Sequence, residues 1–275
     1  MKYIILCSIL SVICVLAGSA VTMLVNRRRA LSAPVKILLS ALFSILLLLS
    51  VSLIYVENYY RAEDWVRERL KENSESGPVT VTKIREGYYL DGPGESSAII
   101  FYGGAKVEEI AYLPLLYRIA GSGGDCFLVK SPFRFAFAGS GAADSILSRY
   151  NYSEWYLAGH SMGGVVAANL AASRSDLISG VILLASYPNT KLPEDLRLLS
   201  IYGSEDGCLD REAYEKSRPN RPADSTEKII EGGSHAQFGA YGEQKGDGTA
   251  SITATEQQDI TAETIIEWIS LNGPR

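Results

Sequence analysis

Two long apolar stretches open the chain. No charged residue occurs over residues 3–26 or 37–56, and each stretch holds about 20 residues or more. A helix rises about 1.5 Å per residue, so helices of this length cross the roughly 30 Å hydrocarbon core of a bilayer. Residues 37–56 are apolar on every side, which is typical of a helix surrounded by lipid. The pattern predicts a hairpin of two transmembrane helices over residues 1–56.

The loop between the stretches, residues 26–36, carries four positive charges and no negative one. Short loops rich in Lys and Arg remain in the cytoplasm, so we expect everything after Glu57 to lie on the extracytoplasmic side of a cell membrane. A second interpretation is a cleaved signal peptide, with small residues at 17–20 near the cleavage point. The apolar run continues beyond that point to Val25, which favours a retained span.

A polar segment over residues 57–78 follows the second stretch. Its aromatic residues Tyr59, Tyr60 and Trp65 suit a membrane interface. We expect a helix leaving the membrane and then a linker at 73–78, which reads Asn-Ser-Glu-Ser-Gly-Pro. The predicted division is therefore a membrane segment over 1–56, a juxtamembrane segment over 57–78 and a folded domain over 79–275.

Short apolar runs alternate with amphipathic stretches from residue 79 onward. Runs typical of buried strands lie at 98–102, 126–129, 155–158, 181–185, 196–202 and 228–230. Helical spacing occurs at 110–120, 142–150, 162–173, 211–217 and 255–271, and 79–89 predicts an outer antiparallel strand. This alternation predicts an α/β domain with a mostly parallel sheet and helices on both faces.

Composition narrows the class of protein further. The 275 residues carry a net charge of -5 without a basic patch, which argues against a nucleic-acid partner. Cys7, Cys14, Cys126 and Cys208 show no CxxC spacing, so they indicate neither a zinc site nor a disulfide framework. We interpret all of them as free thiols.

Ser161 lies in the sequence Gly159-His160-Ser161-Met162-Gly163, between a predicted strand and a predicted helix. A serine at such a junction occupies a tight turn, and glycines at 159 and 163 let that turn close without steric clash. The turn exposes the hydroxyl at the carboxyl edge of the sheet, where open α/β sheets bind ligands. We therefore expect Ser161 to be a nucleophile.

A nucleophilic serine needs a base, and histidine is the usual one. The chain has two histidines. His160 directly precedes the serine, and adjacent residues on a tight turn point in different directions. His235, just after a predicted strand, is therefore the predicted base.

The base needs a carboxylate, which follows the serine and precedes the histidine in chains with this type of turn. A predicted strand ends at Gly203-Ser204-Glu205-Asp206. Asp206 is the best candidate on chain order and strand-end position, with Glu205 and Asp210 as alternatives.

Two backbone N–H groups should bind the oxyanion of the tetrahedral intermediate. One is expected at Met162, directly after the nucleophile. The other is expected in the loop after strand 98–102, at Ala105 first and Gly104 second.

These motifs resemble a known family. The sequence Gly159-His160-Ser161-Met162-Gly163-Gly164, the run 101–107 and the histidine loop 232–242 are similar to the compact bacterial α/β-hydrolases of the dienelactone-hydrolase-like group. The resemblance covers roughly residues 97–272. It implies an α/β-hydrolase fold and a triad of Ser161, Asp206 and His235. Many hydrolases begin the oxyanion loop with His-Gly, where this chain has Gly103-Gly104.

Aromatic residues follow several predicted strands at the edge that carries Ser161. They are Phe133, Phe135, Phe137, Tyr187, Phe238 and Tyr241. Together they predict an apolar cleft for an acyl ester, although the alternation over 133–137 fits a plain strand edge equally well. The polar loop 239–252, with Gly246-Asp247-Gly248, has no assigned role at this stage.

The prediction is thus a membrane-anchored serine esterase that needs no metal and no organic cofactor. Its partners would be a small ester or acyl substrate and the lipid bilayer. A peptidase or amidase on the same triad is a second interpretation. A membrane-tethered, non-catalytic binding protein of the same fold is a third.

Overall fold

The structure, a computed structural model, describes residues 2–28, 31–72 and 77–271. It divides into two compact units, Met1–Asn58 and Tyr59–Arg275. The predicted domain boundary at residue 79 therefore lies inside the second unit, because the segment from Tyr59 onward packs as part of it.

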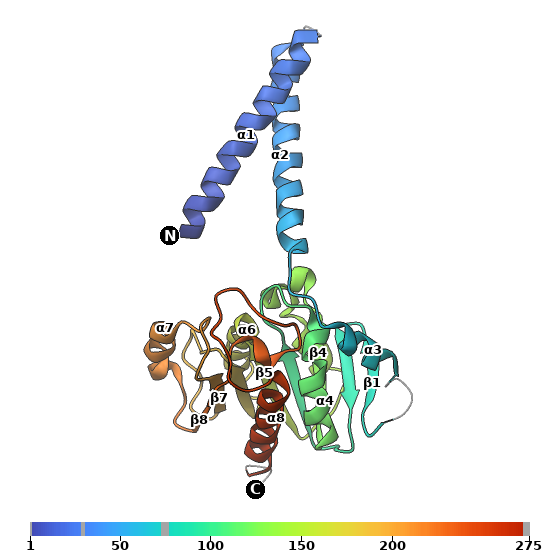
Figure 1. Cartoon of the computed structure of the whole chain (residues 1–275), viewed down its shortest axis with the longest axis vertical. Helices are drawn as coiled ribbons and strands as arrows, with labels where there is room; N and C mark the ends of the chain where they lie inside the picture. The colour runs from blue at the N-terminus through green and yellow to red at the C-terminus, as the bar shows by residue number, and fades with distance from the viewer. Residues whose placement is uncertain (1, 29–30, 73–76, 272–275) are drawn as a thin grey trace. The chain divides into compact units, whose positions relative to one another are not determined.

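The first unit consists of two helices, α1 (Lys2–Arg28) and α2 (Ala33–Glu57) (Figure 1). They pack through small residues: the Oγ atoms of Ser19 and Ser40 are 2.9 Å apart, and a Cβ on Gly18 would lie 2.7 Å from the Ser40 carbonyl oxygen. Close approach at small residues is typical of helix pairs in membranes.

One helix among the described residues, Ala33–Glu57, is long and apolar enough to cross a membrane. In the first helix, the apolar segment Val12–Arg27 is shorter than a span requires. The prediction of two spans is therefore supported for the second stretch and not for the first. The basic loop 26–36 lies partly outside the described residues, which omit 29 and 30.

The second unit is built on one eight-stranded sheet in the order β1-β2-β4-β3-β5-β6-β7-β8. Strand β2 runs antiparallel to both of its neighbours, β1 and β4, and the strands from β4 across to β8 are parallel to one another. The bounds are β1 Thr80–Ile84, β2 Gly87–Asp91, β3 Ser97–Tyr102, β4 Gly124–Val129, β5 Glu154–His160, β6 Gly180–Leu184, β7 Arg197–Gly203 and β8 Ser225–Ile230. This confirms the predicted α/β fold with a mostly parallel sheet.

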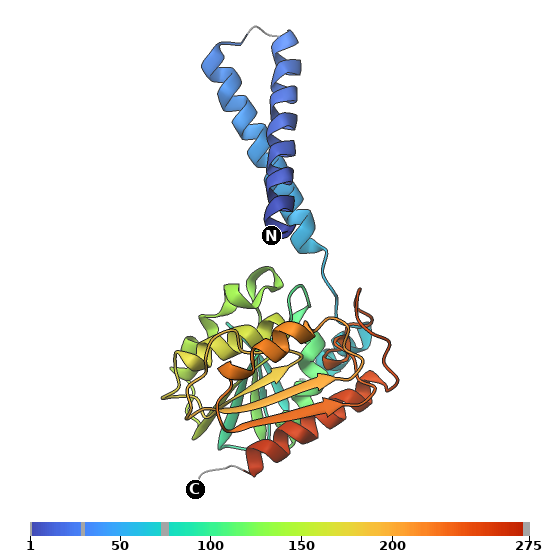
Figure 2. The same ribbon diagram turned by 90° about the vertical axis from the view of Figure 1, so that its left-hand side faces the viewer.

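Helices cover both faces of the sheet (Figure 2). Their bounds are α3 Asp64–Glu72, α4 Leu113–Gly121, α5 Ala142–Leu147, α6 Met162–Ala172, α7 Arg211–Lys216 and α8 Ala254–Ser270. Alternate residues of β3 divide between two cores, because side chains point to opposite faces. Ile99 and Phe101 pack with α4 and α8, and Ile100 and Tyr102 pack with α5 and α6.

The outer strand predicted over residues 79–89 is a hairpin instead. The chain turns at Arg85-Glu86, and β2 begins at Gly87. Gly87 has φ of 148°, and a Cβ there would lie 2.0 Å from the Leu128 carbonyl oxygen. The close approach to β4 requires glycine, so the turn is placed by a neighbouring strand that is distant in sequence.

Candidate active site

Ser161 occupies a strained turn between β5 and α6. Its φ is 53° and its ψ is -121°, a conformation that non-glycine residues rarely adopt. Its amide donates to the Leu184 carbonyl at 2.9 Å, and the Ser186 hydroxyl donates to its carbonyl at 2.7 Å. Strand β6 and the residues after it therefore hold the turn in place, and Ser161 occupies the N-cap position of α6.

Both glycines of the turn are required by close contacts. A Cβ on Gly159 would lie 2.3 Å from the carbonyl carbon of Gly163. A Cβ on Gly163 would lie 2.0 Å from the Tyr102 carbonyl oxygen, at the end of β3. These contacts give a physical reason for the two glycines predicted from the motif.

We expect Gly163→Ala to lower the free energy of unfolding by about 3 kcal/mol or more, because the new methyl group overlaps backbone that cannot move aside. Gly141→Ala is the matched control. Its φ is -68° and no atom lies within 4 Å of its added Cβ, so it should be neutral or slightly stabilising. Thermal unfolding of the full chain in detergent measures both, and equal midpoints for the two variants would contradict this account of the turn.

His235 and Asp206 form a buried pair at the carboxyl edge of the sheet. His235 Nδ1 lies 2.9 Å from Asp206 Oδ2, and the two residues are 3% and 7% exposed. The other carboxylate oxygen of Asp206 accepts the amides of Cys208 and Leu209 at 2.9 and 2.7 Å. The carboxylate is thus fixed by its own loop with one oxygen directed at the imidazole.

The two alternative acids have other roles. Asp210 caps α7 by accepting the Ala213 amide at 2.9 Å. Glu205 is exposed and accepts the Ser204 hydroxyl at 3.0 Å. Of the three candidates, the structure brings only Asp206 to His235.

The hydroxyl of Ser161 makes no hydrogen bond within the described part of the chain. The residue before it, His160, lies next to the candidate base, since the His160 and His235 ring centroids are 4.5 Å apart. Hydrogen bonds between nucleophile and base are often long in unliganded enzymes and tighten with substrate.

Asp247, in the polar loop 239–252 for which no role was predicted, binds the backbone around both the candidate acid and the candidate base. Its Oδ1 accepts the amides of Gly207, His235 and Gly248 at 3.0, 3.1 and 2.8 Å, and its Oδ2 accepts the amide of Ala236 at 2.8 Å. One carboxylate thereby joins the loop that carries the acid to the loop that carries the histidine. A single aspartate between glycines in a long polar loop was the available signal.

His160 packs beneath the site and is not exposed at it. It is 1% exposed, and its Nδ1 lies 2.8 Å from the Tyr112 hydroxyl. The Tyr112 hydroxyl accepts a hydrogen bond from the Gly104 amide at 2.9 Å. We therefore assign this hydroxyl as the donor to Nδ1 of His160, which must be unprotonated to accept. The arrangement requires a neutral imidazole. Burial first, and the nearby His235 second, hold the pKa of His160 well below 6.5.

Stability should therefore decrease in mild acid. The unfolded chain takes up a proton at His160 near pH 6.5 and the folded chain does not, so lowering the pH through this range favours unfolding. The contribution is about 1.4 kcal/mol per pH unit until the folded pKa is reached. The free energy of unfolding of the wild type and of His160→Gln, measured between pH 5 and 7, tests this. Its dependence on pH should be weaker in the variant by about that amount per pH unit. Equal slopes would contradict it.

The structure distinguishes the candidate oxyanion donors. The Gly104 amide is already bonded to Tyr112, so it is not free as the structure stands. The amides of Ala105 and Met162 make no hydrogen bond within the described residues, and Met162 opens α6, where backbone N–H groups lack helical partners. Ala105 and Met162 therefore remain the better pair.

The segment before α3 holds the loop after β3 in place. Tyr60 donates its amide to the Lys106 carbonyl at 2.8 Å and accepts the Glu108 amide at 2.9 Å. Glu108 in turn accepts the Ala62 amide at 2.9 Å and pairs with Arg67. Sequence patterning missed this attachment because a short strand-like bridge has no hydrophobic period of its own.

The predicted aromatic cleft is only partly present. Phe238 is fully buried and Tyr241 is 6% exposed, so both belong to the core. Phe133 and Phe137 are each 62% exposed, in two 3₁₀ turns after β4. The strand edge considered for 133–137 is therefore wrong, and so is the assignment of Phe238 and Tyr241 to a cleft.

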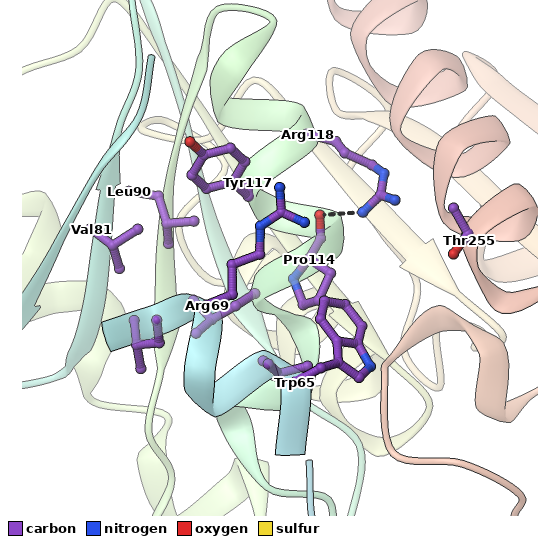
Figure 3. Close-up of a pocket in the computed structure, with 11 residues that line it drawn as sticks. Trp65, Arg69, Val81, Leu90, Pro114, Tyr117, Arg118 and Thr255 are labelled. Atoms are coloured by element: carbon purple, nitrogen blue, oxygen red, sulfur yellow. Dashed lines mark hydrogen bonds between the residues drawn. The ribbon is translucent and has the colours of Figure 1, made fainter. Parts of the chain in front are cut away.

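None of these catalytic candidates lines a cavity of about 550 Å³ in the same unit, whose lining Figure 3 shows. It is bordered by α3, α4, the β1–β2 hairpin and the start of α8, and Arg118 donates to the Pro114 carbonyl in its wall at 2.8 Å. Its lining is Trp65, Val66, Arg69, Leu70, Val81, Leu90, Leu113, Pro114, Tyr117, Arg118 and Thr255.

Comparisons with known proteins place the chain in a family. The profile of the alpha/beta hydrolase family Abhydrolase_5 matches residues 98–259, which contain all three triad candidates. The chain therefore belongs to the α/β-hydrolase family, as its motifs predicted. No curated protein matches the sequence.

Solved structures with the same fold are distant in sequence. Dienelactone hydrolase from Anabaena variabilis is 15% identical, with 72% of this chain and 100% of that chain covered and a TM-score of 0.55. Mouse alpha/beta hydrolase domain-containing protein 10 is 12% identical, covering 70% and 99%, with a TM-score of 0.51. A serine hydrolase involved in carbazole degradation is 14% identical, covering 70% and 100%, with a TM-score of 0.51. At these identities the likeness shows the fold alone.

Proposed function

We propose that this chain is a membrane-anchored serine esterase that transfers the acyl group of its substrate to Ser161. The observation that carries the proposal is the buried pair of His235 and Asp206, 2.9 Å apart, at the same sheet edge as a serine on a strained strand–helix turn. Family membership supports hydrolytic chemistry, and the solved serine hydrolase with this fold is consistent with a serine nucleophile.

The residues have the following roles in the proposed reaction. Nε2 of His235 takes the proton of Ser161 Oγ as the oxygen attacks the ester carbonyl carbon. The amides of Met162 and Ala105 bind the oxyanion of the tetrahedral intermediate. The intermediate collapses, the alcohol leaves with the proton from His235, and water activated by the same histidine then hydrolyses the acyl-serine. Asp206 keeps the proton of neutral His235 on Nδ1 and stabilises the imidazolium.

Helix α2 is the proposed anchor. It meets the criteria for a span, and the basic residues before it favour a cytoplasmic amino end. Tyr59–Arg275 would then lie on the extracytoplasmic side. The orientation does not depend on whether α1 also crosses the bilayer, because the basic loop lies between the two helices. Protease added outside intact spheroplasts should cleave the hydrolase unit, and full protection would contradict this orientation.

A fluorophosphonate probe tests the chemistry directly. The full chain in detergent should gain one adduct, and peptide mapping should place it on Ser161. A panel of p-nitrophenyl esters and p-nitroanilide amides then separates an esterase from an amidase or peptidase. Absence of any adduct at Ser161 would instead favour a non-catalytic protein of this fold.

Asp247 should act as a positioning residue for the same site. We expect Asp247→Ala to lower kcat roughly a hundredfold with a smaller effect on KM. The loops that carry Asp206 and His235 would lose the one carboxylate that binds the backbone of both. Asp247→Asn keeps one oxygen acceptor and should recover part of the loss. Exposed Asp176→Ala, matched in type, should have no effect. Steady-state kinetics on a short ester measure all three variants. A change in KM with kcat unchanged would argue against this role.

A further inference from the structure

The loop after β4 exposes two phenylalanines at the catalytic edge of the sheet. Phe133 and Phe137 are each 62% exposed. Within the described part of the unit Tyr59–Arg275, the other exposed large apolar residues are Trp65, Leu177, Ile229 and Leu271, and no two of these share a loop. Paired exposed aromatics cost free energy in water, so they indicate a surface that meets an apolar partner.

The backbone of this loop is strained and fixed. Phe133 and Arg134 have φ of 54° and 60°, two successive left-handed residues that are not glycine. The Arg134 carbonyl accepts the Lys106 amide at 2.9 Å, which ties the loop to the candidate oxyanion loop. Conformations of this kind persist only where surrounding contacts hold them, and they concentrate at functional positions.

The same loop contacts the residue at which the chain leaves the apolar helix. The Arg134 guanidinium lies 3.3 Å from the Tyr59 ring centroid, and that of Arg61 lies 4.8 Å from it. Tyr59 is two residues beyond Glu57, the end of α2, so the connecting chain spans at most about 7 Å. If α2 crosses a bilayer, the loop is tethered within side-chain reach of its surface.

We propose that residues 132–138 insert the exposed side chains of Phe133 and Phe137 into the bilayer interface, so that the Ser161 edge of the sheet takes acyl esters dissolved in the membrane. The inference rests on the proposed esterase function and on α2 as the anchor. Arg61 and Arg134 flank Tyr59 with positive charge, which anionic lipid head groups attract. The partner is thus a lipid surface, and the substrate class is a membrane-soluble ester.

Tryptophan substitutions test the insertion without using catalysis. Phe133→Trp and Phe137→Trp are prepared separately in a Trp65→Phe background, which leaves only the buried Trp155 and Trp268. The full chain is placed in nanodiscs of phosphatidylcholine and phosphatidylglycerol, with or without brominated acyl chains. Leu177→Trp is the control, since Leu177 is 54% exposed just before β6, at the opposite edge of the sheet.

We expect both loop variants to show blue-shifted emission and strong quenching by brominated lipid, while the Leu177→Trp variant shows neither. Quenching of both loop variants no greater than that of the control would overturn the proposal. This readout is independent of the esterase function, which fails separately if no activity depends on Ser161.

A second measurement addresses the substrate. In Phe133→Ser/Phe137→Ser, the ratio of hydrolysis of a long-chain ester in vesicles to hydrolysis of a short soluble ester should fall roughly tenfold, because two buried aromatic contacts with lipid are lost. An unchanged ratio, with the variant folded by thermal unfolding, would contradict access to the substrate through this surface.

Discussion

Ser161→Ala should abolish ester hydrolysis, lowering kcat roughly a million-fold. The variant keeps the turn, because alanine is smaller and the contacts that hold residue 161 involve its amide and carbonyl. In the proposed mechanism it lacks the nucleophile that forms the acyl-enzyme, so the activity that remains should come from oxyanion binding alone. Hydrolysis of p-nitrophenyl acetate by the full chain, with thermal unfolding as the check on folding, measures the effect.

A matched serine separates this effect from general damage. Ser148 is exposed after α5, and its hydroxyl bonds only a local carbonyl. Ser148→Ala should therefore retain full activity and full labelling by fluorophosphonate. Activity of Ser161→Ala within tenfold of wild type, on the other hand, would remove the serine from the mechanism and leave the His235–Asp206 pair without a nucleophile.

The sheet was largely predictable because its strands are short and apolar throughout. Residues 98–102 and 181–185, for example, were identified as buried strands and became β3 and β6. Local sequence determines such strands, since burial on both faces removes polar residues from them. The motif around Ser161 was predictable for a related reason: the contacts of Gly159 and Gly163 lie within the turn and the adjoining strand.

Features set by distant contacts were not predictable. Tyr60 joins the domain through backbone bonds to Lys106 and Glu108, which leave no trace in side-chain pattern. Asp247 acts through four amides from two other loops and its own. The burial of Phe238 and the exposure of Phe133 likewise depend on how 3₁₀ turns fold over the edge of the sheet. Chain order and position after a strand pointed to Asp206, but Glu205 and Asp210 lie close to the same strand end.

The contacts of Asp206 explain why Asp206→Asn, which replaces one carboxylate oxygen by an NH₂ group, should severely reduce kcat. In Asp206→Asn, the amides of Cys208 and Leu209 still require an acceptor, so the side-chain oxygen stays at the Oδ1 position. The new NH₂ group then faces His235 Nδ1, which must become an acceptor and leave its proton on Nε2. A protonated Nε2 cannot receive the proton of Ser161. We expect kcat to fall about ten-thousandfold near pH 7 while the fold persists, because the two side chains have the same shape.

The alternative acids supply controls of the same chemistry. Asp210→Asn should keep full activity, since asparagine caps a helix as well as aspartate does and Asp210 only caps α7. Glu205→Gln alters an exposed side chain and should also be silent. Rates of ester hydrolysis and of fluorophosphonate labelling, measured for all three variants, rank the acids. A greater loss in Asp210→Asn or Glu205→Gln than in Asp206→Asn would show that the buried pair is structural, because the tautomer argument applies only to the carboxylate that faces His235.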